Sequence, residues 1–510
     1  MLFIRTRIFF ISAAVFVSLN SFSQTKKSSD QTSDELTKVL DYFRKKKDPQ
    51  LLEAALFLVN NSKSHYSVDN IWLDKTGKKI PFETTKFADI EQADLQFKKL
   101  KDSIPLSAKP VIIKDIEALK APFLINNIEL AYKSWKQNPW SAAYDFKTFC
   151  EYILPYRSLT EPMENWRSVY QSIYEKCTVD LTDKSDPVEL CSKIIQNMKH
   201  FDFVINRFDP KPLLGPAELI FWRQGNCPDL ANGALFACRS LGIAVTFDFT
   251  PHYAASSNRH FWNSVIDSKG THIPFNGNQD LPYLYSPNHR RMGKVFRFTF
   301  SEQKQSLVSI IPEKQIPDEF LKSRYIIDVT NEYVPVSDVK YDFENPALSQ
   351  IGYLCVFNRG SWNTIDWAKI TEQKAIFKNI GRNIVYLPGV FESGKLTLEK
   401  NPVLLDLNGA KIILKPDFSN LNKATLSRSN ETKNDFKDNN PFQILKGEKY
   451  NLYVWNGNWQ IIDQQVASED DLVSFSKIPA NGLFLMSSAK PDFFERIFTI
   501  ETSTNKITWY

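Results

Sequence analysis

The feature that most constrains the fold is the segment 225–243, which predicts a helix with a cysteine at its start. Pro228 suits the first turn of a helix, and Asp229 is favoured in the same turn by the helix dipole. Gly242 marks the expected end of the helix, because glycine commonly follows a C-terminal cap. The apolar residues that share one face of this helix are Leu230, Ala234, Ala237, Cys238 and Leu241. Cys227 is therefore predicted to lie at or just before a helix N-terminus.

A cysteine in that position is a candidate nucleophile. The positive end of a helix stabilises a thiolate over a thiol, which makes a nucleophile available near neutral pH. Cys238 lies eleven residues beyond Cys227 on the same predicted helix. At 1.5 Å per residue the two are about 16 Å apart, so they cannot form a disulfide, and Cys238 is predicted to belong to the core.

A thiol nucleophile needs a base, and His260 lies near the start of a predicted strand. Asp267 begins a turn after this strand, and residues 271–276 form the returning strand. Asp267 follows His260 by seven residues, roughly 20 Å at 3.3 Å per residue, so it is too remote to orient the imidazole. In such a hairpin, residues 276 to 278 return beside His260. Asn276 is therefore the predicted third member of a Cys-His-Asn set.

The order of these segments resembles the transglutaminase-like family, which has a papain-type cysteine site. The matching segments are Gly225-Asn226-Cys227, Leu241-Gly242-Ile243, His260-Phe261-Trp262 and Ile273-Pro274-Phe275-Asn276. Asn276 stands where that family usually has Asp. The segments 149–157 and 351–387 also look like parts of transglutaminase-domain proteins exported by Bacteroidetes-type bacteria. The resemblance implies peptide hydrolysis, deamidation or amide-to-amine transfer.

The predicted mechanism begins with attack of the Cys227 thiolate on an amide carbonyl of a peptide or protein substrate. His260 protonates the leaving amine, and Asn276 holds the imidazole. The oxyanion is expected to be held by the Cys227 backbone N–H and a second donor, for which Trp222 and Gln224 are candidates. The predicted function is thus that of a cysteine-dependent amide hydrolase or acyltransferase without a cofactor.

Two other interpretations stay open. A domain that kept the fold and lost activity would be a scaffold in a cell-surface protein. Its β-modules would then contact glycan or peptide through aromatic side chains such as Trp362 and Trp459. A metal site is the other interpretation, but no HExxH or CxxC spacing supports it, and no metal is predicted. The histidines that suggested it by their closeness in sequence are His252, His260, His272 and His289.

The first residues predict an export signal. Arg5 and Arg7 precede an apolar stretch at 8–19 and a small-x-small cleavage site at 21–23, directly before Gln24. The apolar stretch is short for a bilayer span of about 20 residues, so cleavage is favoured over anchoring. The mature protein is therefore predicted to be secreted or periplasmic, with no membrane attachment.

Charge and cysteine content bound the class of partner. The 63 Lys and Arg residues nearly balance the 58 Asp and Glu residues, and the chain contains no block of basic residues, so nucleic acid is not a predicted partner.

Six cysteines in an exported protein invite a disulfide interpretation. Their irregular spacing excludes a disulfide scaffold, but one bridge from Cys177 to Cys191 stays open.

At 510 residues the chain predicts several domains, and the expected fold class is α+β. The predicted parts are a signal peptide at 1–23, a helical N-terminal region at 24–148, a transglutaminase-like catalytic domain at 149–295, an all-β sandwich-like module at 296–426, a linker at 427–440 and a second all-β sandwich-like module at 441–510.

The two C-terminal modules are predicted to be diverged copies with the same strand order. The equivalent positions are Trp362 and Trp459, Phe377 and Phe475, Ile380 and Ile478, Asn383 and Asn481, and Leu387 and Leu485. The spacing differs by one residue inside an Asn-Gly turn, where hairpin loops change length easily. Chance similarity between hairpins is the alternative.

Overall fold

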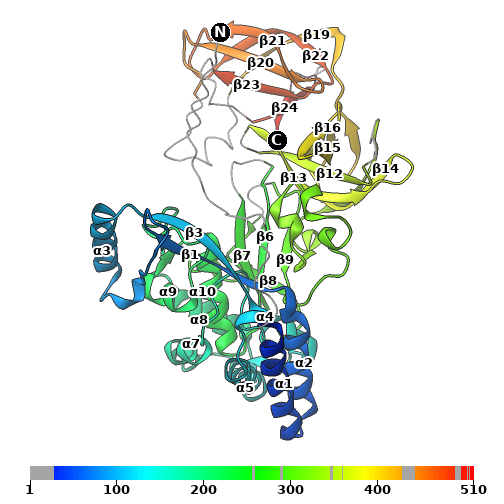
Figure 1. Cartoon of the computed structure of the whole chain (residues 1–510). Helices are drawn as coiled ribbons and strands as arrows, with labels where there is room; N and C mark the ends of the chain where they lie inside the picture. Colours follow the sequence, from blue (N-terminus) through cyan, green and yellow to red (C-terminus); the bar gives the residue numbers. More distant parts are fainter. Residues whose placement is uncertain are drawn as a thin grey trace. The chain divides into compact units, whose positions relative to one another are not determined.

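The computed structural model describes residues 28–254, 259–287, 291–344, 349–358, 360–427, 443–488, 496–501, 504 and 506–510. The predicted signal peptide lies outside these residues, as does the predicted linker from residue 428 onward. The chain divides into two compact units (Figure 1). The first comprises Met1–Phe247, Phe261–Tyr285 and Phe298–Glu302, and the second comprises Asp248–His260, Ser286–Arg297 and Gln303–Tyr510. In the described part of the chain, no helix is both long and apolar enough to span a membrane.

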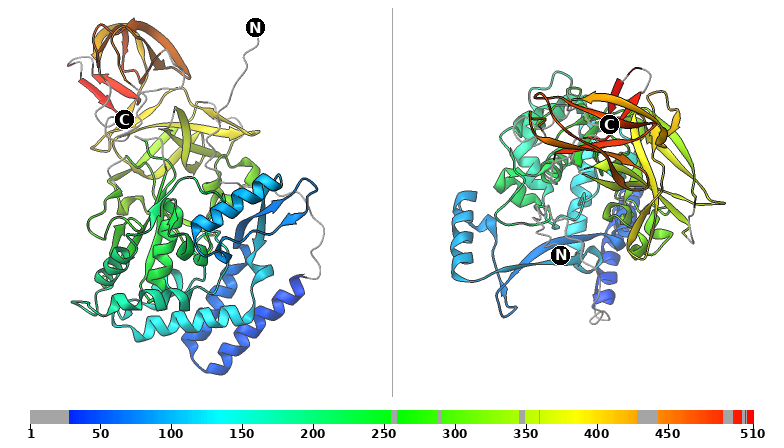
Figure 2. Two further views of the ribbon diagram at one scale, coloured as in Figure 1. Left: turned by 90° about the vertical axis from the view of Figure 1, so that its left-hand side faces the viewer. Right: turned by 90° about the horizontal axis from the view of Figure 1, so that it is seen from above.

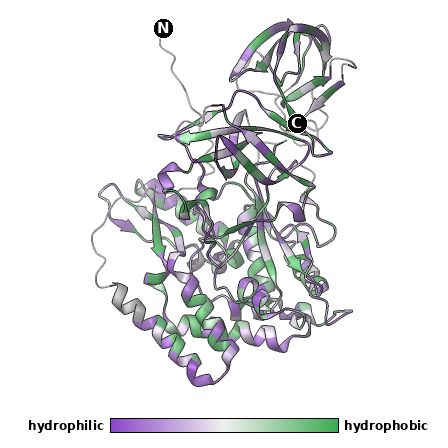
Figure 3. Cartoon of the chain, turned by 90° about the vertical axis from the view of Figure 1, so that its right-hand side faces the viewer, coloured by the Kyte–Doolittle hydropathy of each residue, from purple (hydrophilic) through white to green (hydrophobic). Residues whose placement is uncertain are grey.

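The first unit begins with a layer of helices, as predicted. Its members are α1 (Ser28–Lys46), α2 (Pro49–Asn61), α4 (Asp115–Ala118), α5 (Ala121–Gln137) and α6 (Phe146–Tyr152). The break between α1 and α2 follows from Asp48, whose side chain accepts hydrogen bonds from the N–H groups of Gln50 and Leu51. The helices carry both hydrophobic and hydrophilic residues along their length (Figure 3), as helices at a core surface do.

The N-terminal region also contains a sheet, so the prediction of a helical region at 24–148 is incomplete. Strand β1 (Tyr66–Leu73) pairs antiparallel with β3 (Ser107–Lys114) along its whole length and with the short β2 (Lys79–Ile80). Helix α3 (Ile90–Ser103) lies between β2 and β3 in the sequence. Most residues of β3 are exposed, and its burial does not alternate, so the two-residue period that reveals a strand is missing.

The rest of the first unit is built around helix α10 (Cys227–Ser240), whose residues 229–240 are all buried. The helices near it are α7 (Arg167–Tyr174), α8 (Pro187–Asn197) and α9 (Pro216–Trp222). After α10 the chain enters a sheet with the strand order β10-β9-β6-β7-β8, of which β8 and most of β7 belong to the first unit. Its strands are β6 (Val245–Thr250), β7 (His260–Ile266), β8 (His272–Phe275), β9 (Phe296–Phe298) and β10 (Ile326–Asp328). The predicted helix, the strand after it and the hairpin are confirmed.

The regular secondary structure described in the second unit is mainly β-strand (Figures 1 and 2). The earlier strands are β11 (Val336–Asp342), β12 (Ile351–Asn358), β13 (Ser361–Lys369), β14 (Lys374–Gly381), β15 (Ile384–Glu392), β16 (Lys395–Leu398), β17 (Val403–Leu405) and β18 (Lys411–Ile413). The later ones are β19 (Asp417–Leu426), β20 (Lys449–Trp455), β21 (Trp459–Val466), β22 (Val473–Ala480), β23 (Phe484–Ser488), β24 (Phe498–Glu501) and β25 (Lys506–Trp509). The strand content agrees with the predicted α+β class.

The two copies share one strand order, as predicted, but the second copy includes β19, which the sequence placed in the first. The order β13-β12-β15 in one sheet corresponds to β21-β20-β23 in another, and the pair β11–β14 corresponds to β19–β22. The register of each hairpin shifts at the same place, after Leu354 in β12 and after Leu452 in β20. Asn383 and Asn481 occupy equivalent positions and both have a positive φ, 63° and 56°. A bulge and a backbone conformation that few residues adopt are thus shared by both copies.

Candidate active site

Cys227 is the first residue of α10, so its predicted position at a helix N-terminus is confirmed. The side chain of Asn226 accepts from the N–H of Asp229 at 3.3 Å, and the Asp229 carboxylate accepts from the N–H of Asn226 at 3.1 Å. Pro228 lies in the first turn. This reciprocal capping fixes the start of the helix, and therefore the backbone on which the cysteine is carried.

A buried polar network holds the chain just before Cys227. The Asp229 carboxylate also accepts from the N–H of Leu214 at 3.0 Å and forms an ion pair with Arg207. Burial raises the pKa of Asp229, while Arg207 and the N–H donors act in the opposite direction. Gly225 allows the close approach, because a Cβ there would lie 2.5 Å from the Cβ of Asp229.

Cys227 differs from the other cysteines in its exposure. All six lie in the described part of the chain, and Cys227 alone among them is not buried. Burial raises the pKa of Cys150 to about 12 and also raises the pKa values of Cys177, Cys191 and Cys355. The thiolate forms of these four thiols are therefore disfavoured, whereas Cys227 is partly exposed to solvent.

Asn276 follows β8 and is partly exposed. Its Nδ2 donates to Oε1 of Gln279 at 2.9 Å and to Oδ2 of Asp280 at 3.2 Å, and its N–H donates to the Asp280 carbonyl. These bonds tie the side-chain amide into its own loop.

The loop of Asn276 packs on the helix that carries Cys227. Gly277 has a φ of 46°, and a Cβ at this position would lie 3.3 Å from the carbonyl carbon of Leu230 and 3.4 Å from the nitrogen of Ala231. Leu230 and Ala231 are three and four residues after Cys227, which places them one turn further along the same face. The first unit therefore brings two of the predicted site segments together.

His260 is the first residue of β7 and is partly buried. The hairpin register pairs Asn263 with Phe275, and the Asp267 carboxylate accepts from two N–H groups of the turn at 2.8 Å each. Asp267 is thus committed to the hairpin tip, as predicted. His260 ends a segment of the second unit, whereas Cys227 and Asn276 belong to the first, so its pairing with Cys227 stays a prediction.

The expectation that Trp222 serves as an oxyanion donor is wrong. Its Nε1–H donates to Oγ1 of Thr84 at 3.2 Å, and its ring stacks on Phe208 with 4.8 Å between ring centroids. The N–H groups of Asn226 and Asp229 are engaged in the capping of α10, so neither of them replaces it. Gln224 lies in the short strand β5 (Gln224–Gly225), beside β4 (Asp202–Phe203), and stays a candidate.

The tryptophans that suggested a binding platform are packed together. Trp362 is 9% exposed, and its ring lies 5.4 Å from Phe357 and 5.6 Å from Trp455, measured between centroids. Trp459 lies 5.6 Å from Phe357 and 5.2 Å from Trp455. These contacts join the two equivalent hairpins of the second unit, so both side chains act in packing.

The described residues contain no group of side chains arranged to bind a metal ion. No group of three or more His, Cys, Asp and Glu side chains there is placed to hold a metal ion. His252 lies 3.4 Å from an oxygen of Asp318, and His289 lies outside the described residues.

Comparison with known proteins gives no family assignment. No family model and no curated protein matches the chain. Solved structures similar to it include a putative cysteine protease from Cytophaga hutchinsonii, with 17% identity over 22% of this chain and 38% of that chain, and a TM-score of 0.18. Red sea bream transglutaminase matches with 9% identity over 86% of this chain and 77% of that chain, and a TM-score of 0.21. The chain spans well under half of the first of these structures, and TM-scores this low carry no argument about fold or activity.

Proposed function

We propose that the chain is an exported, transglutaminase-like protein that cleaves or transfers peptide or protein amide bonds through a Cys227 nucleophile. The observation that carries the proposal is local to the first unit. A partly exposed cysteine begins a capped helix whose residues 229–240 are all buried, and the loop of Asn276 packs one turn away. A helix N-terminus of this kind stabilises a thiolate, and the sequence supplies His260 as the base.

The proposed reaction has two stages. The Cys227 thiolate attacks the amide carbonyl carbon, and the oxyanion that forms accepts a hydrogen bond from the Cys227 N–H and a second donor. His260 gives its proton to the leaving amine, the C–N bond breaks, and a thioester remains on Cys227. Water or a second amine then attacks the thioester, His260 accepts its proton, and the thiolate is released.

Asn276 acts in this proposal as a positioning residue that accepts a hydrogen bond from the His260 ring. Asn278 is the nearest alternative for the same role. It is 4% exposed, its Nδ2 donates to the Phe201 carbonyl, and its Oδ1 has no hydrogen-bond partner among the described residues. The two asparagines therefore need separate variants.

The test is a map of cysteine alkylation by iodoacetamide as a function of pH in the folded protein. Cys227 is expected to react faster than any other cysteine, and this preference is expected to persist below pH 7. His260→Ala is expected to lower the Cys227 rate at pH 6 by about tenfold or more, because an ordinary thiol is under about 1% ionised there. Asp267→Ala is the matched control and should leave the rate unchanged.

The asparagine variants and a substrate screen complete the experiment. Whichever of Asn276→Ala and Asn278→Ala lowers the Cys227 rate at pH 6 identifies the residue that orients His260. Turnover is then measured on peptide and glycopeptide amides, with and without an added amine, to separate hydrolysis from transfer. A Cys227 that reacts no faster than Cys238, or at a rate that does not respond to His260→Ala, would leave the chain as an inactive scaffold.

A further inference from the structure

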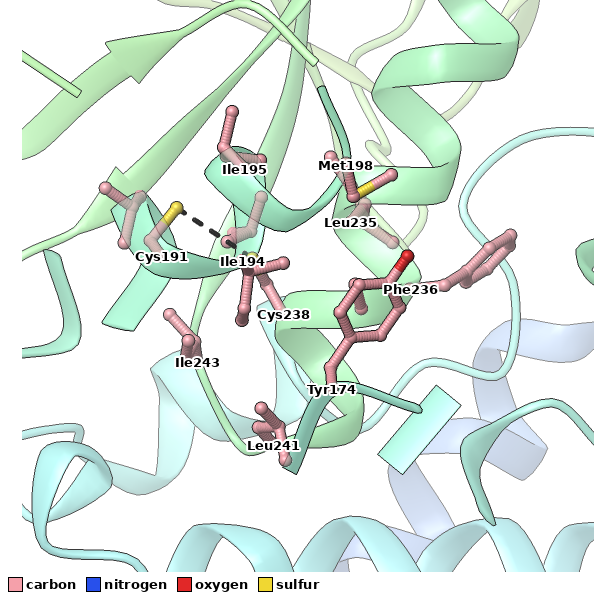
Figure 4. Packing of buried hydrophobic residues seen from close by; sticks show 14 of the residues in the cluster. Tyr174, Cys191, Ile194, Ile195, Met198, Leu235, Phe236, Cys238, Leu241 and Ile243 are labelled. Atoms are coloured by element: carbon pink, nitrogen blue, oxygen red, sulfur yellow. Dashed lines mark hydrogen bonds between the residues drawn. The ribbon is translucent and has the colours of Figure 1, made fainter. Parts of the chain in front are cut away.

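Two buried cysteines meet in the core of the first unit. Cys191 lies on α8 and Cys238 on α10, and both are fully buried. Their sulfur atoms are 3.8 Å apart. Figure 4 shows the two side chains pointing toward each other. The apolar side chains around them include Ile194, Ile195, Leu235, Leu241 and Ile243.

We propose that Cys191 and Cys238 form a disulfide when the chain folds in an oxidising compartment. A disulfide bond is about 2.05 Å long, so sulfur atoms already in contact need to close by less than about 2 Å. Helix α8 carries one of these sulfur atoms and α10 the other, and both lie inside the same apolar core. The inference rests on the export that the proposed function includes, but not on its chemistry, because it concerns neither the nucleophile nor its base.

The structure favours this pair over the bridge that the sequence left open. The Cys177 sulfur lies 3.9 Å from the carbonyl oxygen of Lys193, while Cys191 is in contact with Cys238. Cys227 begins α10 and Cys238 is near its end, about 16 Å away along the helix axis, so the bond leaves Cys227 as a thiol. Among the described residues no third His, Cys, Asp or Glu joins this pair in a group that could hold a metal ion, and two sulfurs alone do not complete a zinc or iron–sulfur site.

The bond forms by two thiol–disulfide exchanges with a disulfide donor, such as an oxidised dithiol protein or oxidised glutathione. One cysteine, as a thiolate, attacks a sulfur of the donor, which gives a mixed disulfide and releases one donor thiolate. The second cysteine attacks the chain's own sulfur in that mixed disulfide and releases the other donor thiolate. The two protons pass to the released thiolates, and two electrons pass from the chain to the donor.

Burial decides when these exchanges happen. The folded core excludes a donor from both sulfurs, and burial raises the pKa of Cys191, so its thiolate is disfavoured there. The bond therefore forms before the core closes. The same burial then protects it from reductants for as long as the first unit stays folded.

The test compares the full-length chain secreted into an oxidising compartment with the same chain made in a reducing cytosol. Each is unfolded without reductant, its thiols are alkylated, and its peptides are mapped by mass spectrometry. The secreted protein is expected to show four alkylated cysteines of the six and one peptide pair linked through Cys191 and Cys238, lighter by two hydrogen atoms. The cytosolic protein is expected to show six. Dithiothreitol should release the linked pair only when denaturant is also present.

The decisive measurement uses the unmodified chain, so it does not depend on any variant that fails to fold. Cys177→Ala is the matched control and should leave the linked peptide in place. Cys191→Ala should abolish it and leave Cys238 alkylated. Six alkylated cysteines in the secreted protein, or a link from Cys177 to Cys191, would overturn the inference.

Discussion

His65 makes the stability of the first unit depend on pH. It is 7% exposed, its Nε2 lies 3.0 Å from the carbonyl oxygen of Phe300, and its ring stacks on the Phe300 ring with 4.4 Å between centroids. Burial, aided by the positive charge of Arg157, lowers the pKa of His65 from 6.5 to about 3, although the hydrogen bond to Phe300 favours the protonated form. The imidazole is therefore neutral in the folded protein at pH 5 and above.

The sign of the effect follows from proton binding in the two states. The unfolded chain protonates His65 below pH 6.5, whereas the folded chain does so only near pH 3, so the unfolded state binds more protons between these values. The stability that neutral His65 contributes is complete above pH 6.5 and is lost as the pH falls toward 3. At about 1.4 kcal/mol per pH unit, the free energy of unfolding should fall by about 2 kcal/mol between pH 8 and pH 5.

The perturbation is His65→Gln, which keeps an N–H donor for the Phe300 carbonyl and cannot be protonated. Between pH 8 and pH 5, wild type is expected to lose about 2 kcal/mol more than this variant in urea unfolding followed by tryptophan fluorescence. Burial raises the pKa of Asp209 to about 6 and that of Glu164 to about 7, which gives the opposite pH dependence. Both acids are present in wild type and in the variant, so their contributions to the pH dependence cancel when the two proteins are compared. His200→Gln, at an exposed histidine, is the control.

NMR spectra of protein labelled at the histidine rings test the reasoning directly. The resonance that disappears in His65→Gln belongs to His65 and should not titrate above pH 5. A midpoint near 6.5 for that resonance would refute the argument, because the folded and unfolded pKa values would then be equal. Equal losses of stability in wild type and variant would refute it as well.

Two further predictions concern the backbone and the export signal. Gly242→Ala is expected to cost about 3 kcal/mol of unfolding free energy in urea denaturation, because φ is 82° and the new Cβ would lie 2.7 Å from a main-chain oxygen. Gly270→Ala has the same φ but no described atom within 4 Å, so it should cost only about 1–2 kcal/mol; equal costs would contradict the clash. Mass spectrometry of the exported protein should find a mature N-terminus at or near Gln24, and retention of Met1 would remove the secretory interpretation.

The sequence predicted correctly those features of the fold that depend on residues close together in the chain. The two ends of α10 were predicted correctly from Pro228, Asp229 and Gly242. Residues in the first turn and just after the last turn of a helix act on the backbone next to them, so their effect can be seen in the sequence. The repeat was visible because turns and bulges constrain single positions, such as the positive φ at Asn383 and Asn481. These features required no knowledge of which segments pack together.

Features that depend on tertiary contact were missed or misread. The sheet of β1 and β3 has little alternation of burial, so no two-residue period revealed it. Trp222 lies close to Cys227 in sequence, but its indole N–H donates a hydrogen bond to Thr84, which is far away in sequence. Strand β19 precedes the predicted linker and yet pairs with β22, which only a contact between distant segments can show. The pairing of Cys191 with Cys238 was hidden for the same reason, because six cysteines allow about 15 full sets of pairs.

The placement of the cysteines explains how a thiol nucleophile could persist in an oxidising compartment. Cys150 belongs to the core cluster of the N-terminal helices and Cys355 to a cluster in the second unit, so each is enclosed by apolar side chains. Cys177 is buried against a carbonyl oxygen, and Cys238 is paired with Cys191. If that pair is oxidised, no buried thiol can exchange with Cys227 without unfolding its own surroundings. The same helix, α10, then carries a structural disulfide near its end and an accessible nucleophile at its start.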